Sequence, residues 1–400
     1  DPWARAMTSL GSSPWFLTVC LMLVLGLIGS KFSNIFYEWW YRGYRRKPSF
    51  YANQEIFIKP FPGENDTWDE EESFVSSDGT RLHVYHKPVK EGPAKALFLF
   101  VHPVALHAGW FAHVGTNLHK HGVHVAAIDL RGHGKSSGFR GHIGSFGNVL
   151  RDVDDLATSL AEKLGGGGGG GGGHQSHDHH VDSKTATAAA GSSSSSSSAS
   201  ENNRSSSGRP NIPVYIGGLG FGALVASACA HENRHMYAGL VALSPHAETD
   251  TLEGWSSVMC LLSFLSPCLR MWGTSHILLK HSRNLAVGKA LQSDPLVVLP
   301  TWRTAREIRL LTRRVISIIP KLRVPLLYMQ GLQDLIADPQ GSIIWHGDTQ
   351  ALTGRLKDIV LMKNGWHNIL LEPEHEHVID RMVTWITRDL ELRLLQRTLD

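Results

Sequence analysis

Residues 214–226, VYIGGLGFGALVA, restrict the fold of this chain more than any other stretch. An apolar strand runs into a glycine-rich turn, and a helix of small residues follows at once. This succession is the setting of a nucleophile elbow, G-x-S-x-G, in which a strained turn lifts a serine hydroxyl above the end of a sheet. The frame here is Gly218-x-Gly220-x-Gly222. Glycine occupies the position of the serine, so the question of enzymatic activity depends on Gly220.

Buried strands alternate with helices on both sides of this stretch. Apolar runs and helical spacing predict strands at 96–101, 123–128, 239–243, 324–330 and 358–361, and helices at 110–120, 148–164 and 374–395. Strands that are apolar on both faces and alternate with helices indicate a parallel sheet with helices on both sides. The expected fold class is therefore α/β, with a doubly wound and mostly parallel sheet.

Two segments interrupt the expected domain, which covers 76–400. Residues 165–210 combine a glycine run, serine runs and four histidines, and such a composition cannot bury enough apolar surface to become ordered. We expect a disordered insertion there. A metal site is not favoured, because mobile ligands do not form a preorganised site; the histidines are His174, His177, His179 and His180. Residues 247–318 are helical and broken by prolines, which predicts a helical cap.

The N-terminal region, 1–47, carries an apolar run at 15–29. Counted strictly, this run is shorter than the roughly 20 residues of a membrane-spanning helix, and Lys31 interrupts its extension. Aromatic residues and then four cations follow it, which is typical of a membrane interface and its cytoplasmic side. We expect a single-pass transmembrane anchor at about 14–36, with the main domain in the cytoplasm. A cleaved signal peptide is disfavoured because no small-x-small cleavage site ends the run.

Residues 48–75 are polar and acidic, and they form either a solvated linker or an edge hairpin. The formal charge of +3 is too small for a nucleic-acid-binding protein, which usually carries a basic face. The four cysteines are far apart and form no C-x-x-C pair, so neither a zinc site nor a disulfide framework is indicated. We expect no cofactor, no metal and no nucleic-acid partner.

Two further side chains complete a catalytic pattern with the elbow. An acyl-transfer triad needs a nucleophile, a histidine that takes its proton, and a carboxylate that orients the histidine. Position 220, Asp334 and His367 follow one another in the order nucleophile, acid, histidine, and each comes directly after a predicted strand. Catalytic groups of open α/β sheets collect at those strand ends. We therefore expect the three positions to meet at one site.

Several ordered motifs carry a family resemblance. They are the segment 129–146, with D-L-R-G-H-G-K-S-S-G and R-G-H-I-G-S-F, the cap segment 293–296, the acid segment 319–334, and the histidine segment 365–374. From about 77 to 395 the chain resembles the monoacylglycerol lipase and serine aminopeptidase-like branch of the α/β-hydrolase fold. The resemblance implies a serine hydrolase that acts on acyl lipids, with Asp334 as acid, His367 as base, and the backbone N–H groups of Val104 and Phe221 as oxyanion hole.

The chain departs from the family pattern at four positions. Gly220 replaces the serine and Leu219 the preceding histidine, while Pro103 and Leu106 replace a glycine and a glutamate of the early H-G-x-x-E-H motif. Proline lacks an N–H and fixes φ, which alters the oxyanion hole. Without a hydroxyl no acyl-enzyme forms. We therefore predict a membrane-anchored pseudo-hydrolase whose site binds a lipid-like acyl ligand or a partner.

Two alternatives stay open. The first is an active lipase or esterase that acts on monoacylglycerol-like lipids through Asp334 and His367, with water or another serine as nucleophile; Ser227 and Ser244 are the serines nearby, and neither is expected on a strained turn. The second is a dinucleotide-binding fingerprint, Gly218-x-Gly220-x-x-Ala223. It lacks the acidic residue expected at the end of the next strand, which closes with Ser244-Pro245.

Overall fold

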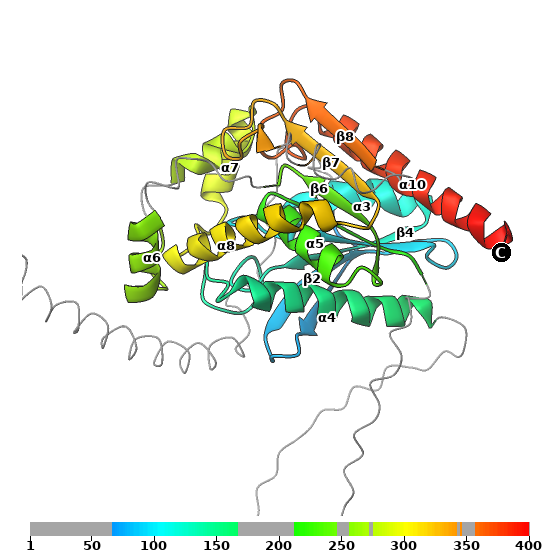
Figure 1. Ribbon diagram of the computed structural model, residues 1–400, viewed down its shortest axis with the longest axis horizontal. Coiled ribbons are helices and arrows are strands. Elements are labelled where there is room, and N and C mark those ends of the chain that lie inside the picture. Colours follow the sequence, from blue (N-terminus) through cyan, green and yellow to red (C-terminus); the bar gives the residue numbers. More distant parts are fainter. Residues whose placement is uncertain are drawn as a thin grey trace, which may run out of the picture.

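The computed structural model describes residues 66–166, 212–245, 256–271, 275–341, 345 and 357–399. These residues form an eight-stranded sheet in the order β1-β2-β4-β3-β5-β6-β7-β8 (Figure 1). The strands pair in parallel from β4 to β8, and β1 and β2 add an antiparallel edge. Their bounds are β1 Glu70–Val75, β2 Arg81–Lys87, β3 Ala96–Val101, β4 Val123–Asp129, β5 Val214–Leu219, β6 Tyr237–Leu243, β7 Leu326–Gly331 and β8 Lys357–Met362.

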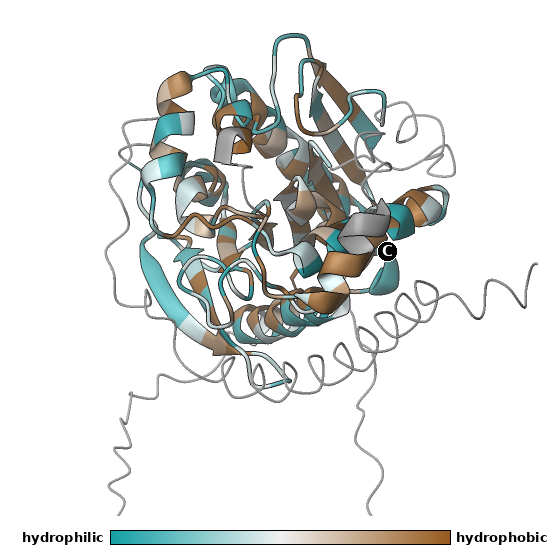
Figure 2. Cartoon of the chain, turned by 90° about the vertical axis from the view of Figure 1, so that its left-hand side faces the viewer, coloured by the Kyte–Doolittle hydropathy of each residue, from teal (hydrophilic) through white to brown (hydrophobic). Residues whose placement is uncertain are grey.

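Helices cover both faces of the sheet, which confirms the predicted α/β class. The helices α4, α5 and α8 share one buried apolar cluster with one face, and α3 and α10 share a second cluster with the other. Figure 2 shows strands that are mostly brown in the middle of the domain, and helices around them in which brown and teal residues alternate. The bounds are η1 Ala108–Phe111, α3 Ala112–Leu118, η2 His119–His121, α4 Phe146–Gly165, α5 Phe221–Glu232, α6 Ser256–Leu265, η4 Ser275–Lys280, α7 Leu285–Ser293, α8 Trp302–Ile318, η5 Ile319–Lys321 and α10 His375–Leu399.

The glycines of the β5–α5 turn let the backbone pack closely. A Cβ atom on Gly222 would lie 2.1 Å from the carbonyl oxygen of Val101, the last residue of β3. A Cβ on Gly218 would lie 2.4 Å from the carbonyl carbon of Gly222. Backbone cannot yield at such distances, so these glycines are required by the approach of α5 to β3. This explanation of Gly218 and Gly222 needs no bound phosphate.

The structure defines the elements within two of the predicted segments, 48–75 and 247–318, more closely than the sequence does. The polar stretch 48–75 was expected to be a linker or an edge hairpin, and its described end forms β1, which pairs with β2 from Glu70↔His86 to Val75↔Arg81. Within the range 247–318, α6, η4 and α7 lie beyond the carboxyl ends of the strands (Figure 1). By contrast, α8 packs on α5 and buries Leu311 and Val315 in the main core.

The predicted anchor at 14–36 and the histidine-rich insertion lie outside the described residues. Within the described ranges, no helix combines the length and the apolarity that crossing a bilayer requires. The same ranges contain no group of three or more metal-ligating side chains.

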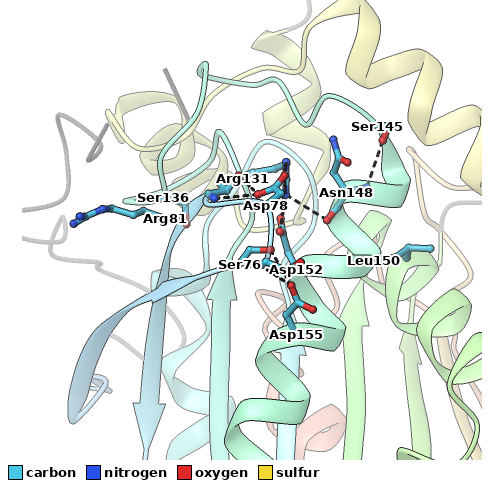
Figure 3. A network of polar contacts seen from close by, with 12 residues as sticks. Ser76, Asp78, Arg81, Arg131, Ser136, Ser145, Asn148, Leu150, Asp152 and Asp155 are labelled. Carbon is cyan, nitrogen blue, oxygen red and sulfur yellow. Dashed lines mark hydrogen bonds and ion pairs between the residues drawn. The ribbon is translucent and has the colours of Figure 1, made fainter. Parts of the chain in front are cut away.

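A buried ionic network holds the loop after β4 (Figure 3). The guanidinium of Arg131 is fully buried, and its Nε and Nη2 atoms donate to both carboxylate oxygens of Asp152, at 2.7 and 2.6 Å. Its Nη1 atom donates to Asp78 at 3.1 Å. Burial raises the pKa of Asp152, although the Arg131 charge opposes this. Two short parallel hydrogen bonds to the guanidinium favour the ionised carboxylate of Asp152.

Candidate active site

Gly220 has the backbone conformation of a nucleophile elbow. It lies between β5 and α5 with φ 56° and ψ −117°, and its N–H donates to the carbonyl oxygen of Leu243 at 2.9 Å. Residues with a side chain rarely adopt a positive φ, whereas glycine does so without strain. The turn therefore keeps the geometry that presents a side chain above the sheet, but it carries no side chain.

The predicted acid and histidine lie at the ends of two neighbouring strands, β7 and β8. His367 Nδ1 is 2.8 Å from Asp334 Oδ2, and both side chains are buried. The Asp334 carboxylate also accepts hydrogen bonds from the Gln330 amide at 2.9 Å and from the backbone N–H groups of Ile336 and Ala337, both at 2.8 Å. A carboxylate with these partners accepts only, so Nδ1 carries the proton of the His367 ring and a neutral ring leaves Nε2 as a base.

The surroundings keep Asp334 ionised. Burial alone would raise the pKa of this carboxyl, but the neighbouring His367 and the N–H groups of Ala337 and Ile336 outweigh burial and hold the pKa below its ordinary value. A charged Asp334 fixes the orientation of the imidazole and stabilises an imidazolium.

The elbow and the Asp–His pair meet at one point. A Cβ atom built on Gly220 would lie 2.9 Å from His367 Nε2 and 3.4 Å from Pro103 Cβ. The direction in which a side chain would leave position 220 is therefore the direction of the basic nitrogen. The structure brings together the three positions that the sequence predicted, and no nucleophilic side chain is present at position 220.

The candidate oxyanion hole consists of two backbone N–H groups next to the elbow, those of Phe221 and Val104. Phe221 is the first residue of α5, so its N–H has no partner inside the helix. Among the described residues, no acceptor is recorded for the N–H of Val104, which lies half-buried in the loop after β3. This loop is tightly turned, because Ala105 has φ 75° and Leu106 N–H donates to Pro103 O at 3.3 Å. The proline is thus accommodated without loss of a compact turn.

Sequence reasoning missed the support of this loop. His102 Nε2 accepts from the N–H of Leu130 at 2.9 Å, so its Nδ1 carries the proton and donates to Pro103 O at 2.7 Å. Burial lowers the pKa of His102 to about 3, which keeps the ring neutral. His107 and Trp110 both donate to Asp294, at 3.0 and 2.8 Å, and so bind the end of α7 to this loop. The cap motif at 293–296 was the available signal for that last contact.

The two substitute serines do not occupy the elbow. Ser227 lies inside α5, is fully buried, and donates to the carbonyl oxygen of Ala223 at 2.6 Å. Ser244 ends the segment after β6 with a strained φ of 41°, contrary to the expectation of an unstrained position. Its Oγ is buried and has no hydrogen-bond partner in the described part of the chain. In the described part of the chain, the Ser227 hydroxyl bonds within its own helix and the Ser244 hydroxyl makes no hydrogen bond.

A mostly parallel sheet with a positive-φ turn after β5 and a buried Asp–His pair after β7 and β8 defines an α/β-hydrolase. The sequence matches the profile of the family described as serine aminopeptidase, S33, over residues 92–166 and 197–374. Since this match spans more than half of the chain, the chain belongs to that family. The unmatched residues 167–196 lie within the predicted insertion.

Relatives and solved structures agree with this assignment. The monoglyceride lipase homolog of Monkeypox virus is 23% identical over 309 residues, which cover 76% of this chain and 92% of the relative. Monoglyceride lipase of Homo sapiens is 26% identical over 276 residues, which cover 68% of this chain and 75% of the relative. The crystal structure of Paleococcus ferrophilus monoacylglycerol lipase aligns with a TM-score of 0.58 at 21% identity, over 77% of this chain and 99% of that chain. The last likeness establishes the fold alone.

Proposed function

We propose that this chain is a monoglyceride lipase-like α/β-hydrolase that has lost the acylation step and retains a site for an acyl lipid of the monoacylglycerol type. The observation that carries the proposal is the conformation of Gly220. This residue has the backbone geometry of the elbow, and a Cβ atom built on it would point at His367 Nε2. Without a hydroxyl at this point no acyl-enzyme forms.

The ligand class rests on the relatives, several of which are named monoglyceride lipases. We further propose that residues 14–36 anchor the chain in a membrane with the α/β domain on the cytoplasmic side. The support is the apolar run with the aromatic residues and the cations that follow it. A protein held at a bilayer would meet acyl lipids at high local concentration.

A second candidate is slow hydrolysis by water, which His367 would activate as a general base. The observation that favours it is the hydrogen bond between His367 Nδ1 and Asp334, which fixes the tautomer needed for a base at Nε2. In this candidate, ester turnover disappears in His367→Ala. In the first proposal, no turnover exists to be lost.

The decisive experiment is labelling with a fluorophosphonate serine probe. We expect no labelling of the native chain, labelling of Gly220→Ser, and none of Gly220→Ala, which adds the Cβ without the hydroxyl. Ligand binding is measured separately as a shift of the thermal midpoint by a monoacylglycerol, with a free alkane as control. A native chain that is labelled, or that hydrolyses a nitrophenyl ester in a His367-dependent way, contradicts the proposed loss of acylation.

A further inference from the structure

The loops at the amino ends of the parallel strands form a second surface, at the end of the strands opposite the candidate active site. A hollow of about 600 Å³ lies there between the loops before β3 and β4 and the last turns of α10. Its lining includes Lys90, Lys95 and Lys120 together with Leu390 and Leu394. We call the hollow and the last turns of α10 the amino edge.

The lysines of the amino edge belong to two loops that are held together. The N–H of Lys95 donates to the carbonyl oxygen of Gly122 at 2.8 Å, and the Lys95 side chain lies across Gly122. Lys90, Lys95 and Lys120 are exposed, and within the described ranges none of the three is ion-paired. Glu91 and Glu391 line the same hollow, so its net charge is small but positive.

Cations continue along the same edge of the sheet. Arg234 and Arg323 are exposed and each precedes the next parallel strand, β6 and β7, by a few residues. An anionic surface would therefore meet positive charge along several neighbouring strand starts. The attraction of such clusters to anionic lipid headgroups falls off within a Debye length.

Exposed leucines accompany these charges on α10. Leu392, Leu394 and Leu395 are 44%, 58% and 61% exposed in the last turns of this helix. Figure 1 shows this end of α10 on the side of the domain away from α6 and α7. Large apolar side chains next to cations are typical of segments that lie in the headgroup region of a membrane.

The described chain also begins at this edge. Lys87, the last residue of β2, donates from Nζ to the carbonyl oxygen of Thr67 at 2.7 Å. Lys87 pairs with Val125 near the start of β4, so the entry of the chain is at the amino ends of the parallel strands. The first described residues thus lie at the same edge that carries the lysines and leucines.

The cap offers a weaker match to an anionic membrane. Helix α6 exposes Leu261 and Leu265, but its sequence, SSVMCLLSFL, contains no charged residue. Apolar exposure on α6 therefore comes without the charges that distinguish anionic from zwitterionic lipid. On α7 one exposed leucine, Leu285, precedes the exposed Lys289 by one helical turn, whereas the amino edge combines three exposed leucines with three exposed lysines.

We propose that the amino edge docks on an anionic lipid bilayer through Lys90, Lys95 and Lys120 and the terminal leucines of α10, with the cap and the elbow facing away from that bilayer. This orientation is independent of the proposed function. It also differs from docking through the cap, which would put the elbow against the lipid.

The test is hydrogen–deuterium exchange of the full chain with vesicles of phosphatidylcholine alone or mixed with equal parts of phosphatidylserine. We expect slower exchange at 89–95, 119–122 and 387–399 with phosphatidylserine only, and loss of this protection in high salt. In Lys95→Gln/Lys120→Gln the affinity for the anionic vesicles should fall roughly 30-fold, since each lysine contributes about fivefold to binding at an anionic surface. The matched control Lys289→Gln/Lys363→Gln removes two exposed lysines from the cap and the opposite edge and should leave protection unchanged.

Three outcomes would overturn the proposal. Protection of α6 in place of the amino edge would show docking through the cap. Equal protection by inorganic phosphate or by phosphatidylcholine vesicles would show that an anionic bilayer is not the ligand. Unchanged protection in the Lys95→Gln/Lys120→Gln variant, with exchange of the central strands as a check of folding, would exclude the lysines.

Discussion

The substitution Gly220→Ser tests whether the site lacks anything except its nucleophile. The new Cβ would sit at φ 56° and ψ −117°, 2.9 Å from His367 Nε2. A non-glycine residue in such a conformation costs about 1–3 kcal/mol of stability. The contact also requires the imidazole to move by a few tenths of an ångström against its hydrogen bond to Asp334. We therefore expect a folded but less stable protein, with a thermal midpoint lowered by roughly 2–10 °C.

The expected gain in activity follows from two opposing effects. A serine nucleophile in an intact triad accounts for on the order of 10⁶ in kcat. Loss of one oxyanion donor removes about 10²–10³ of such a gain. Because Pro103 changes the loop that carries Val104, we expect Gly220→Ser to raise ester hydrolysis by about 10³ or more over the native chain.

The assay compares Gly220→Ser with Gly220→Ala in parallel. Both variants add the Cβ and should lose similar stability by urea denaturation, but only the serine variant should react with a fluorophosphonate and hydrolyse a nitrophenyl ester. The reasoning is refuted if Gly220→Ser folds with the expected stability and still does not react. In that case His367 Nε2 is not positioned to take the proton of a hydroxyl at 220.

Three further predictions concern stability, each measured by urea denaturation. Burial lowers the pKa of His102, His133 and His142 to about 3 from the ordinary 6.5, so between pH 3 and 6.5 these rings are protonated only in the unfolded state. The free energy of unfolding should therefore fall as the pH drops from 6.5 toward 3, by about 1.4 kcal/mol per pH unit for each ring. Equal urea midpoints at pH 7 and pH 5 would argue against neutral buried rings. Gly222→Ala places a Cβ 2.1 Å from a backbone oxygen and should destabilise by about 1–3 kcal/mol or more, whereas a neutral effect would mean that this glycine serves another purpose. Arg131→Met leaves the buried carboxylate of Asp152 without its guanidinium partner and should destabilise by about 3–5 kcal/mol, and a loss below 1 kcal/mol would show that the network in Figure 3 is dispensable.

The sequence predicted the central part of the fold because strands of a buried parallel sheet have continuous apolar runs in their sequence. The strand 96–101 was placed at its observed bounds, Ala96–Val101. The meeting of Asp334 and His367 was also predictable, since each follows one of two strands that pair in parallel, β7 and β8. In such sheets the carboxyl ends of neighbouring strands lie side by side.

Other features of the fold depend on contacts between residues far apart in the sequence, which a local sequence pattern does not predict. The amphipathic spacing of α8 predicts a helix, but it does not say that α5 covers its apolar side. Charged residues are rarely buried, so the loop position of Arg131 gave no sign of complete burial between two aspartates. The strained φ of Ser244 is likewise set by its neighbours, because its N–H is held by Met329 O at 2.8 Å.

The persistence of the Asp–His pair around Gly220 has a structural explanation of its own. The Asp334 carboxylate is bound by Gln330, Ile336 and Ala337 as well as by His367, so it closes the loop after β7 whether or not a nucleophile is present. A serine at 220 would strain the backbone of the elbow and lower the stability of the fold by about 1–3 kcal/mol, and glycine avoids this cost. A chain without selection for acyl transfer would thus gain stability by losing the serine and lose stability by losing the aspartate. An intact acid and histidine are therefore weak support for catalysis, and the chemistry at position 220 must decide the function.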